Sequence, residues 1–268
     1  MIDCHVHFWK LDRGDYTWLT SERPNLFQDY LPEQFPGLSD HIGVDGCIAI
    51  QAAPTESETN YLLDLADSHE WILGVIGWSD LTSPQISQNL TQLSSRSKFK
   101  GVRPMAGVQN SSQWLDLPEY QPGFKALASQ NLILEALSLP VHLNGIASVA
   151  KRHGDLQIVI NHAAKPMPAE FTEWAANIRQ FALLENTFCK VSGFTQQSQS
   201  FDHHLNVFEI LIEVFGPKRL LWGSDYPVLK ETSDYGSWVS ITNRLFDILQ
   251  QPEAALIKSE SAKRLYKL

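Results

Sequence analysis

The sequence contains few cysteines and no long hydrophobic run. Its three cysteines, Cys4, Cys47 and Cys189, include no Cys-x-x-Cys pair. This excludes a disulfide framework, and we interpret the residues as buried thiols of a reducing compartment, the cytoplasm. No apolar stretch approaches the roughly 20 residues that a membrane-spanning helix needs, so no membrane partner is expected. The first residues lack a basic segment followed by an apolar one, and we expect no secretory signal.

Positive charge is also scarce. The chain has 21 Lys and Arg against 30 Asp and Glu, a formal net charge of −9 and a pI near 5.4. Because no basic patch is present, we expect no nucleic-acid partner. The 268 residues, 43% of them hydrophobic, are enough for one α/β domain covering 1–268. The composition leaves a homo-oligomer open.

The chain lacks a Gly-x-Gly-x-x-Gly motif, the fingerprint of dinucleotide-binding folds. Instead, short apolar runs alternate with amphipathic segments along its whole length. The runs predict eight strands: Ile2–Phe8, Val44–Ala52, Ile72–Trp78, Lys100–Met105, Leu132–Ser138, Gln157–Asn161, Phe188–Ser192 and Arg219–Gly223. The segments between them predict helices at Asn60–Ser68, after Ser83-Pro84, and at Tyr120–Ser129, Leu143–Arg152, Glu170–Leu184, His203–Val214 and Gly236–Gln250.

Eight strands, each followed by a connecting segment, predict a (β/α)8 TIM barrel, which typically has about 250 residues. An open doubly wound sheet is the alternative with the same alternation. Two helix starts are marked: Thr55 and Glu58 form a capping box, and Ser83 before Pro84 predicts an N-cap. The first connection, Trp9–Gly43, is unusually long and rich in aromatic residues, and we interpret it as a lid over the barrel mouth.

Polar side chains stand at the predicted carboxyl ends of the strands, where TIM-barrel enzymes carry their active sites. In chain order they are His5 and His7, Gln51, Trp78, Arg103, Glu135, His162, Lys190 and Asp225. Residues i and i+2 of a strand share a face, so His5 and His7 could hold one metal ion or one carbonyl oxygen. Core packing and hydrogen-bonded structural histidines are the non-functional alternatives.

Asp225 follows Gly223 and Ser224 and is the predicted general base, with a helix N-cap as the alternative. We assign substrate binding to Arg103, Lys190, Gln51, Trp9 and Trp78. An ion pair at the barrel rim is the alternative for Arg103 and Lys190, and core packing for the tryptophans. The other histidines are set aside: His203 and His204 are expected at an exposed helix start, and His41, His69, His142 and His153 lie away from the strand ends.

These motifs together resemble the amidohydrolase superfamily, in particular the amidohydrolase 2 group that includes sugar-acid lactonases. The resemblance runs along the whole chain. It rests on Asp3-x-His5-x-His7-Phe8-Trp9, Asp15-Tyr16-x-Trp18-Leu19, Gln51-Ala52-Ala53-Pro54, Gly101-Val102-Arg103, His162-Ala163-x-Lys165-Pro166, Cys189-Lys190-x-Ser192-Gly193 and Trp222-Gly223-Ser224-Asp225-Tyr226-Pro227. It implies a distorted barrel that hydrolyses cyclic esters.

The resemblance also implies a metal site at His5, His7, His162 and Asp225, with zinc as the expected divalent ion. Some members of the group act without metal, and their histidines polarise the carbonyl directly. This chain departs from the superfamily at two strand ends. Arg103-Pro104-Met105 supplies no lysine for a two-metal bridge, and Glu135 stands where a histidine ligand is common. A two-metal centre is therefore disfavoured.

The predicted function is hydrolysis of a sugar-acid lactone, with Asp225 activating water and His5, His7 and His162 polarising the carbonyl. Burial under a lid is expected to raise the pKa of Asp225 and make it a better base. A metal-dependent decarboxylase on the same fold is the second hypothesis. A barrel that binds a sugar acid without turnover is the third.

Overall fold

Eight parallel strands form one sheet in the order β1 to β8 in a computed structural model that describes residues 1–39, 42–105 and 114–268. The strands are β1 (Ile2–Val6), β2 (Gly46–Ile50), β3 (Ile72–Gly77), β4 (Phe99–Val102), β5 (Ile133–Ala136), β6 (Ile158–Ile160), β7 (Thr187–Val191) and β8 (Leu220–Trp222). Every neighbouring pair is parallel and follows chain order, so each connection returns the chain to the same end of the sheet.

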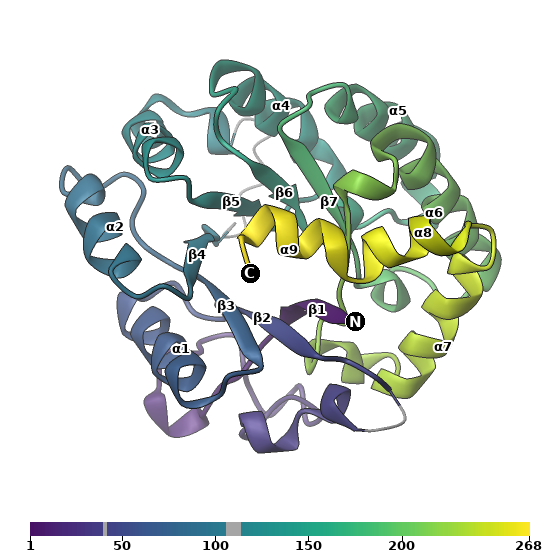
Figure 1. The fold of residues 1–268 in the computed structure, drawn as a ribbon, viewed down its shortest axis with the longest axis horizontal. Helices are drawn as coiled ribbons and strands as arrows, with labels where there is room; N and C mark the ends of the chain where they lie inside the picture. The colour runs from purple at the N-terminus through teal and green to yellow at the C-terminus, as the bar shows by residue number, and fades with distance from the viewer. Residues whose placement is uncertain (40–41, 106–113) are drawn as a thin grey trace.

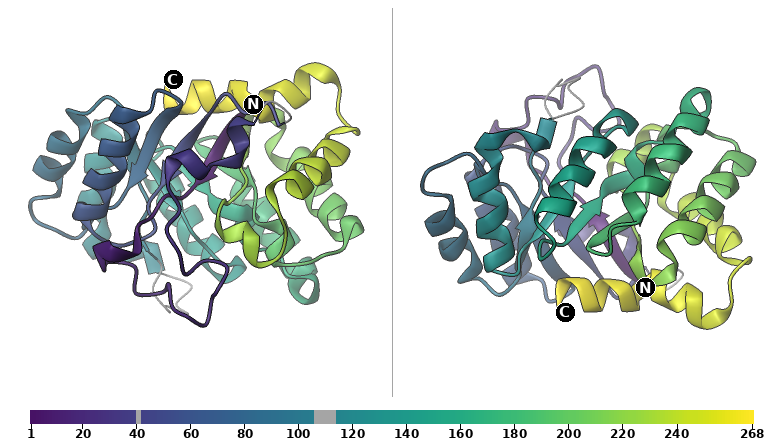
Figure 2. Two further views of the ribbon diagram at one scale, coloured as in Figure 1. Left: turned by 90° about the horizontal axis from the view of Figure 1, so that it is seen from below. Right: turned by 90° about the horizontal axis from the view of Figure 1, so that it is seen from above.

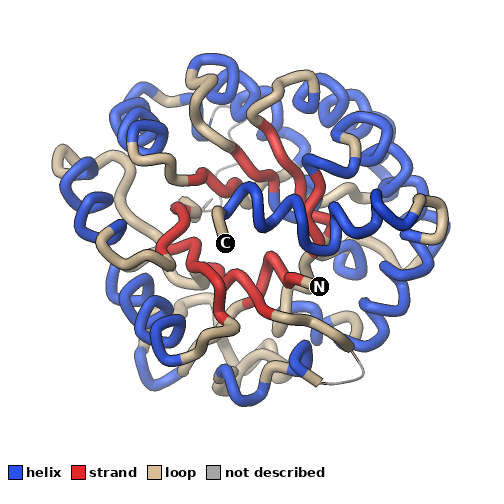
Figure 3. The backbone as a smooth tube through the Cα atoms, viewed as in Figure 1, coloured by secondary structure: helices blue, strands red, loops and turns tan. Residues whose placement is uncertain are grey.

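The sheet closes into a barrel between its last and first strands. The residues after β8 run parallel to β1, with a bridge between Val6 and Tyr226. The amide of Asp225 donates to the carbonyl of His5 over 2.9 Å, and the amide of His7 donates to the carbonyl of Tyr226 over 2.7 Å. The predicted (β/α)8 barrel is thereby confirmed, and the doubly wound alternative is wrong (Figures 1 and 3).

Helices surround the barrel on its outside (Figure 1). They are α1 (Glu56–Ser68), α2 (Ile86–Ser94), α3 (Gln121–Ser129), α4 (Leu143–Arg152), α5 (Phe171–Ala182), α6 (Phe201–Phe215) and α7 (Tyr235–Phe246), one after each strand from β2 to β8. Thr55 caps α1 as predicted, since its side chain accepts from the amide of Glu58. Ser83 does not cap α2, which begins two residues beyond Pro84.

The strands end earlier than the sequence predicts. An apolar cluster that includes Ile48, Ile76 and Val159 lies in the barrel interior, which also contains the buried pair of Glu135 and Lys190. The predictions extend the strands by one to three residues at their carboxyl ends. The apolar runs continue into buried loops, so hydrophobicity alone does not mark where the ladder of hydrogen bonds stops.

The connection from β1 to β2 contains short 3-10 turns, Leu11–Arg13, Pro32–Gln34 and Pro36–Leu38, and no α-helix among its described residues. It is nevertheless packed. Trp9 and Tyr30 exchange backbone hydrogen bonds, and the rings of Trp9, Trp18 and Tyr30 meet edge to face. His41 lies outside the described residues.

The C-terminal segment crosses one end of the barrel. It comprises α8 (Gln251–Ala255), a π-helical turn (Leu256–Glu260) and α9 (Ser261–Tyr266). Figure 2 shows these helices at the end where the N-terminus lies, with the long connection after β1 at the opposite end. Among the described residues, no helix has the length and apolar character needed to cross a membrane.

Candidate active site

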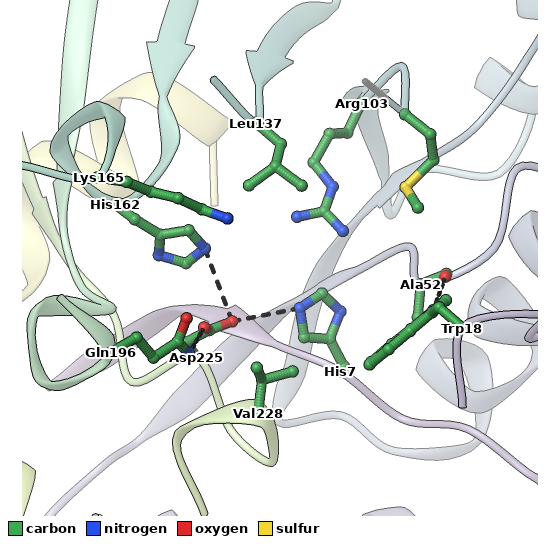
Figure 4. Close-up of a pocket in the computed structure, with 11 residues that line it drawn as sticks. His7, Trp18, Ala52, Arg103, Leu137, His162, Lys165, Gln196, Asp225 and Val228 are labelled. Atoms are coloured by element: carbon green, nitrogen blue, oxygen red, sulfur yellow. Dashed lines mark hydrogen bonds and ion pairs between the residues drawn. The ribbon is translucent and has the colours of Figure 1, made fainter. Parts of the chain in front are cut away.

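A pocket opens among the carboxyl ends of the strands (Figure 4). It is lined by His7, Trp18, Ala52, Arg103, Met105, Leu137, His162, Lys165, Gln196, Asp225 and Val228. Four of these, His7, Arg103, His162 and Asp225, were predicted as site residues, although they come from strands far apart in the sequence. Apolar side chains such as Trp18, Leu137 and Val228 form the rest of the wall.

Three histidine rings converge on one carboxylate oxygen. The Nε2 atoms of His5, His7 and His162 lie 3.5, 3.4 and 3.7 Å from Oδ1 of Asp225. All four side chains are nearly or completely buried. The barrel therefore brings together the four residues that the sequence predicts as its catalytic centre.

Neighbouring groups fix the orientation of Asp225. Its other oxygen, Oδ2, accepts a 2.7 Å hydrogen bond from the Gln196 amide. Its backbone has a positive φ of 63°, which is uncommon outside glycine, asparagine and aspartate. The preceding amide, that of Ser224, donates to the buried carboxylate of Asp3, which also accepts from the amide of His5. Asp3 thus ties the ends of β8 and β1 together beside the site.

Burial favours the neutral histidine rings. It lowers the pKa of His162 to about 3 and also lowers the pKa of His5 and His7. For Asp225, burial acts to raise the pKa, but the adjoining His162 and His7 rings and the Gln196 amide outweigh it and lower the pKa to about 2. Burial acts in the expected direction, but these neighbouring groups reverse the net shift, so the expectation of a raised pKa is wrong.

His7 is held in a tautomer suited to binding a cation. Its Nδ1 lies 2.8 Å from the carbonyl oxygen of Ile50, which can only accept, so Nδ1 carries the hydrogen. The Nε2 lone pair of the neutral ring then faces Oδ1 of Asp225, another acceptor, and a cation or proton between them would relieve this contact. Neutral imidazole and ionised carboxylate are also the forms that bind metals. His5, His7 and Asp225 therefore fit a divalent metal ion, with His162 adjacent.

Arg103 borders the same site. Its guanidinium donates to the carbonyl and side chain of Gln51, and Nη1 lies 3.4 Å from Nε2 of His5. The Gln51 amide in turn donates to the carbonyl of Arg103 over 2.8 Å. Gln51 is fully buried and outside the pocket lining, so in this structure it holds Arg103 in place.

Lys190 lies beneath the pocket and is absent from its lining. Its ammonium pairs with Glu135 over 2.5 Å and lies 3.4 Å from Nδ1 of His5. Glu135 also accepts from Asn161 and from Tyr266 of α9. This is the ion-pair arrangement considered for Lys190, found in the barrel core instead of at the rim.

The two tryptophans assigned to substrate binding are also absent from the pocket lining. Trp9 is fully buried, and its indole nitrogen donates to the carbonyl of Gln28. Trp78 follows β3, and its backbone amide donates to the Thr59 hydroxyl. Trp18, in the aromatic connection after β1, lines the pocket instead and donates to the carbonyl of Ala52.

Three polar or aromatic lining residues were not assigned from the sequence: Trp18, Lys165 and Gln196. Trp18 and Lys165 occur in the motifs that carry the family resemblance, which was the available signal. Gln196 follows β7 in a stretch of glutamines and serines that has no distinguishing pattern. Among the histidines set aside, His204 is 1% exposed and contacts the carbonyl of Ser198, so its expected exposure is wrong.

The chain is similar to known proteins over its full length. A family model described as Amidohydrolase matches residues 2–268. An L-fucono-1,5-lactonase of Burkholderia ambifaria is 32% identical over 261 residues, which cover 94% of this chain and 90% of that protein. An L-fucono-1,5-lactonase of Burkholderia multivorans is 28% identical over 100% of this chain and 96% of that protein. The crystal structure of a Burkholderia multivorans amidohydrolase with bound Zn superposes with a TM-score of 0.93 at 29% identity, covering 100% of this chain and 99% of that one.

Proposed function

This chain belongs to the amidohydrolase family, and from that premise we propose that it hydrolyses the lactone ring of a sugar acid. The observation that carries the proposal is the convergence of His5, His7 and His162 on one oxygen of Asp225 inside a pocket. A ring ester needs a group that polarises its carbonyl and a base for water, and this cluster offers both within hydrogen-bonding reach of a bound substrate. The similarity to L-fucono-1,5-lactonases supports this reaction class.

In this reaction Asp225 accepts the proton of the attacking water on Oδ1 while Gln196 holds Oδ2. Because its pKa is about 2, Asp225 stays ionised and takes the proton only as the water oxygen bonds to the carbonyl carbon. The same proton then passes from Asp225 to the ring oxygen when the carbon–oxygen bond breaks. The products are a carboxylic acid and a hydroxyl group, so atoms and charge balance.

Nearby donors stabilise the charge that develops on the carbonyl oxygen. Arg103 presents its guanidinium to the pocket and is held by Gln51. Preorganised donors of this kind lower the barrier because they need no rearrangement during the reaction. Trp18, Leu137 and Val228 form the apolar wall that limits access of bulk water. We also propose that the connection around Trp18 serves as the lid over the pocket.

We propose Zn2+ as the divalent ion at His5, His7 and Asp225, with His162 as a further ligand. When bound, zinc would supply Lewis acidity to the lactone carbonyl. The experiment is metal analysis of the purified protein together with a pH-indicator screen of sugar-acid lactones, with and without chelator. Activity that survives complete removal of metal would disprove a required zinc ion and leave the histidines and Arg103 as the polarising groups.

The function is tested by replacing the base. Asp225→Asn should reduce kcat by at least about 100-fold, since the amide cannot accept the proton of water. Circular dichroism and thermal unfolding would check that the fold is retained. The matched control is Asp247→Asn, because Asp247 is exposed and is not among the residues that line the pocket. Full activity of Asp225→Asn would remove Asp225 from the mechanism.

A decarboxylase with the same fold is the second hypothesis. The products of the two reactions distinguish it from lactone hydrolysis. Lactone opening consumes water and releases acid, whereas decarboxylation releases carbon dioxide. Carbon dioxide production from an aromatic or unsaturated acid, with no lactone hydrolysed, would reject our proposal. Binding of sugar acids without turnover of any lactone would favour the non-catalytic alternative.

We propose a cytoplasmic location, supported by three buried cysteines that are all free thiols. A homo-oligomer is the proposed assembly, and sedimentation velocity of the purified protein would test it. A monomer over the whole accessible concentration range would reject the assembly without affecting the proposed reaction.

A further inference from the structure

Tyr235 is a buried tyrosine at the start of α7, next to the junction where β8 meets β1 and the barrel closes. Its hydroxyl donates a 2.8 Å hydrogen bond to Oδ2 of Asp3, and both side chains are almost fully buried. Neither Tyr235 nor Asp3 is among the described residues that line the pocket. Any effect of Tyr235 on the reaction must therefore pass through other residues.

Asp3 connects this hydroxyl to the backbone of two segments that carry catalytic groups. Its other oxygen, Oδ1, accepts from the amide of His5 over 3.1 Å and from the amide of Ser224 over 2.9 Å. Ser224 immediately precedes Asp225, the proposed base. The orientation of the Asp3 carboxylate thus bears on the positions of both His5 and Asp225, and Tyr235 bonds the oxygen opposite to the one that accepts the two amides.

The backbone of Asp225 depends on such contacts. Its φ of 63° lies in a region that residues with a Cβ atom rarely adopt, so the surroundings must hold it there. Its amide donates to the carbonyl of His5, and its carbonyl accepts from the amide of Leu229, both over 2.9 Å. Figure 4 shows its carboxylate between the rings of His7 and His162. A shift of the preceding residue would therefore move the carboxylate relative to the histidines.

Helix α7 is attached to this end of β8 at a second point. The indole of Trp238 donates to the carbonyl of Gly223 over 2.8 Å. Tyr235 and Trp238 are three residues apart and so lie on the same side of the helix. The start of the helix is itself fixed, because the Asp234 side chain accepts from the amide of Ser237. The helix therefore holds Gly223 directly and Ser224 through Asp3.

The junction is too closely packed for the Tyr235 hydroxyl to move freely. A Cβ atom at Gly37 would lie 2.7 Å from this hydroxyl, and a Cβ atom at Gly223 would lie 2.9 Å from the Cβ of His5. The Tyr235 ring also meets the rings of Phe35 and Trp222 edge to face. The hydroxyl is thus held at a fixed place from which it can orient Asp3.

We propose that Tyr235 is a positioning residue, which acts through Asp3 and Ser224 to hold Asp225 against the three histidines. This inference rests on the proposed lactone hydrolysis and adds to it a residue that lies outside the pocket. A displaced base slows the reaction more than it weakens substrate binding, because alignment matters most while bonds form and break. Removal of the Tyr235 hydroxyl should accordingly affect kcat more than KM.

Tyr235→Phe tests this directly, since it removes the hydroxyl and keeps the ring. The variant should lower kcat about 10-fold and leave KM within about twofold. The control is Thr187→Val, which removes a buried hydroxyl that donates to the carbonyl of Leu184 at the amino end of β7, away from the pocket. It should lose thermal stability as Tyr235→Phe does but keep kcat within about twofold. Equal falls of kcat in both variants would attribute the effect to lost stability and overturn the inference.

A double-variant cycle tests whether Tyr235 acts through Asp3. In an Asp3→Ala background the hydroxyl no longer has a carboxylate to orient, so adding Tyr235→Phe should change kcat by less than about twofold. Circular dichroism would check that Asp3→Ala is folded. A further 10-fold loss of kcat in this background would show that Tyr235 acts by another route and contradict the inference.

A structural comparison keeps the inference testable without turnover, and also if Asp3→Ala does not fold. Crystal structures of the wild type and Tyr235→Phe should differ by about 0.5 Å or more in the position of the Asp225 carboxylate relative to His5 and His7. If no lactone is hydrolysed, the proposed reaction fails while this comparison still decides the role of Tyr235. A carboxylate that keeps its wild-type position in Tyr235→Phe would refute the inference.

Discussion

At the scale of single residues, Gln196 decides which oxygen of Asp225 is free to react. Its amide donates to Oδ2 over 2.7 Å, so Oδ1 is the oxygen that faces the three histidines. A carboxylate that can rotate would spend part of its time with neither oxygen aligned. Gln196 is thus a positioning residue for the base.

Gln196→Leu should therefore lower kcat about 10- to 100-fold with a smaller change in KM, since a misplaced base impairs the reaction more than substrate binding. Steady-state kinetics with a hydrolysed lactone measure both values. Gln199→Leu is the control, because Gln199 bonds the carbonyl of Thr195 and does not contact Asp225. A change confined to KM would indicate that Gln196 contacts the substrate instead.

The sequence predicts the polar residues of the site better than their roles. His5 lies near the end of β1, and His7, His162 and Asp225 follow their strands within three residues. Because parallel strands bring their carboxyl ends together, the convergence of these residues was predictable. The hydrogen-bond and ion-pair partners of Lys190 were not predictable in this way. Whether a lysine near a strand end points into the pocket or pairs with Glu135 below it depends on strand register, which a single sequence does not specify.

At the scale of elements, the turn from β2 to α1 is fixed by one buried carboxylate. Both oxygens of Glu58 accept hydrogen bonds, from the amides of Ala52 and Ala53 at 2.8 and 2.9 Å. Ala52 lines the pocket and accepts from the Trp18 indole. Only half of the capping box predicted at Thr55 and Glu58 therefore forms, because the Glu58 carboxylate accepts from the end of the strand instead of from the Thr55 amide.

Glu58→Ala should lower the free energy of unfolding by about 2–4 kcal/mol, since it leaves two buried amides without acceptors. Urea denaturation followed by circular dichroism measures this loss. Thr55→Ala, which removes the helix cap alone, should cost only about 1 kcal/mol. Glu22→Gln, at an exposed position, should be neutral. A Glu58→Ala variant as stable as the wild type would show that water satisfies these amides.

The connection between β1 and β2 reaches the pocket through Trp18. Its indole is tied to Ala52 and its ring packs on Trp9. Trp18→Ala should raise KM about 10-fold or more through loss of wall area, with thermal stability changed less than by Trp9→Ala, because Trp9 is fully buried. Kinetics and thermal unfolding of the two variants check the contrast. An unchanged KM in Trp18→Ala would argue against a lid at this segment.

At the scale of the whole molecule, α9 contributes to the barrel core. Tyr266 donates to Glu135 over 2.7 Å, Glu135 pairs with Lys190, and Lys190 contacts His5. The polar chain spans the barrel from the C-terminal helix to the candidate site. All of these side chains are almost fully buried, so each depends on its neighbour for charge or hydrogen-bond compensation.

Lys190→Met should destabilise the protein by about 3–5 kcal/mol, because it leaves the charge of Glu135 buried and unpaired. Tyr266→Phe removes one hydrogen bond and should cost only about 1–2 kcal/mol. The double variant Lys190→Met with Glu135→Leu should recover much of the loss, since neither charge of this pair then remains. Denaturant unfolding of the three variants would check this order. A double variant that is no more stable than Lys190→Met alone would contradict this order.

The barrel itself was predictable because its signal is redundant. Eight apolar runs and the helical periods between them agree on one architecture, and errors of a few residues at each end do not alter it. The helices α8 and α9 carry no such repeat. Their position across the barrel follows from the packing of Leu265 and Tyr266 on the interior, a tertiary contact without a local pattern.

The catalytic site depends on the seam between β1 and β8, where the barrel closes during folding. Closure joins residues more than two hundred positions apart, through the bonds between Asp225 and His5 and between His7 and Tyr226. Contacts so distant in sequence carry the largest loop-closure cost and form slowly. The catalytic groups sit on that seam. Recovery of enzyme activity during refolding should therefore lag behind recovery of helical content, which makes turnover a direct kinetic probe of barrel closure.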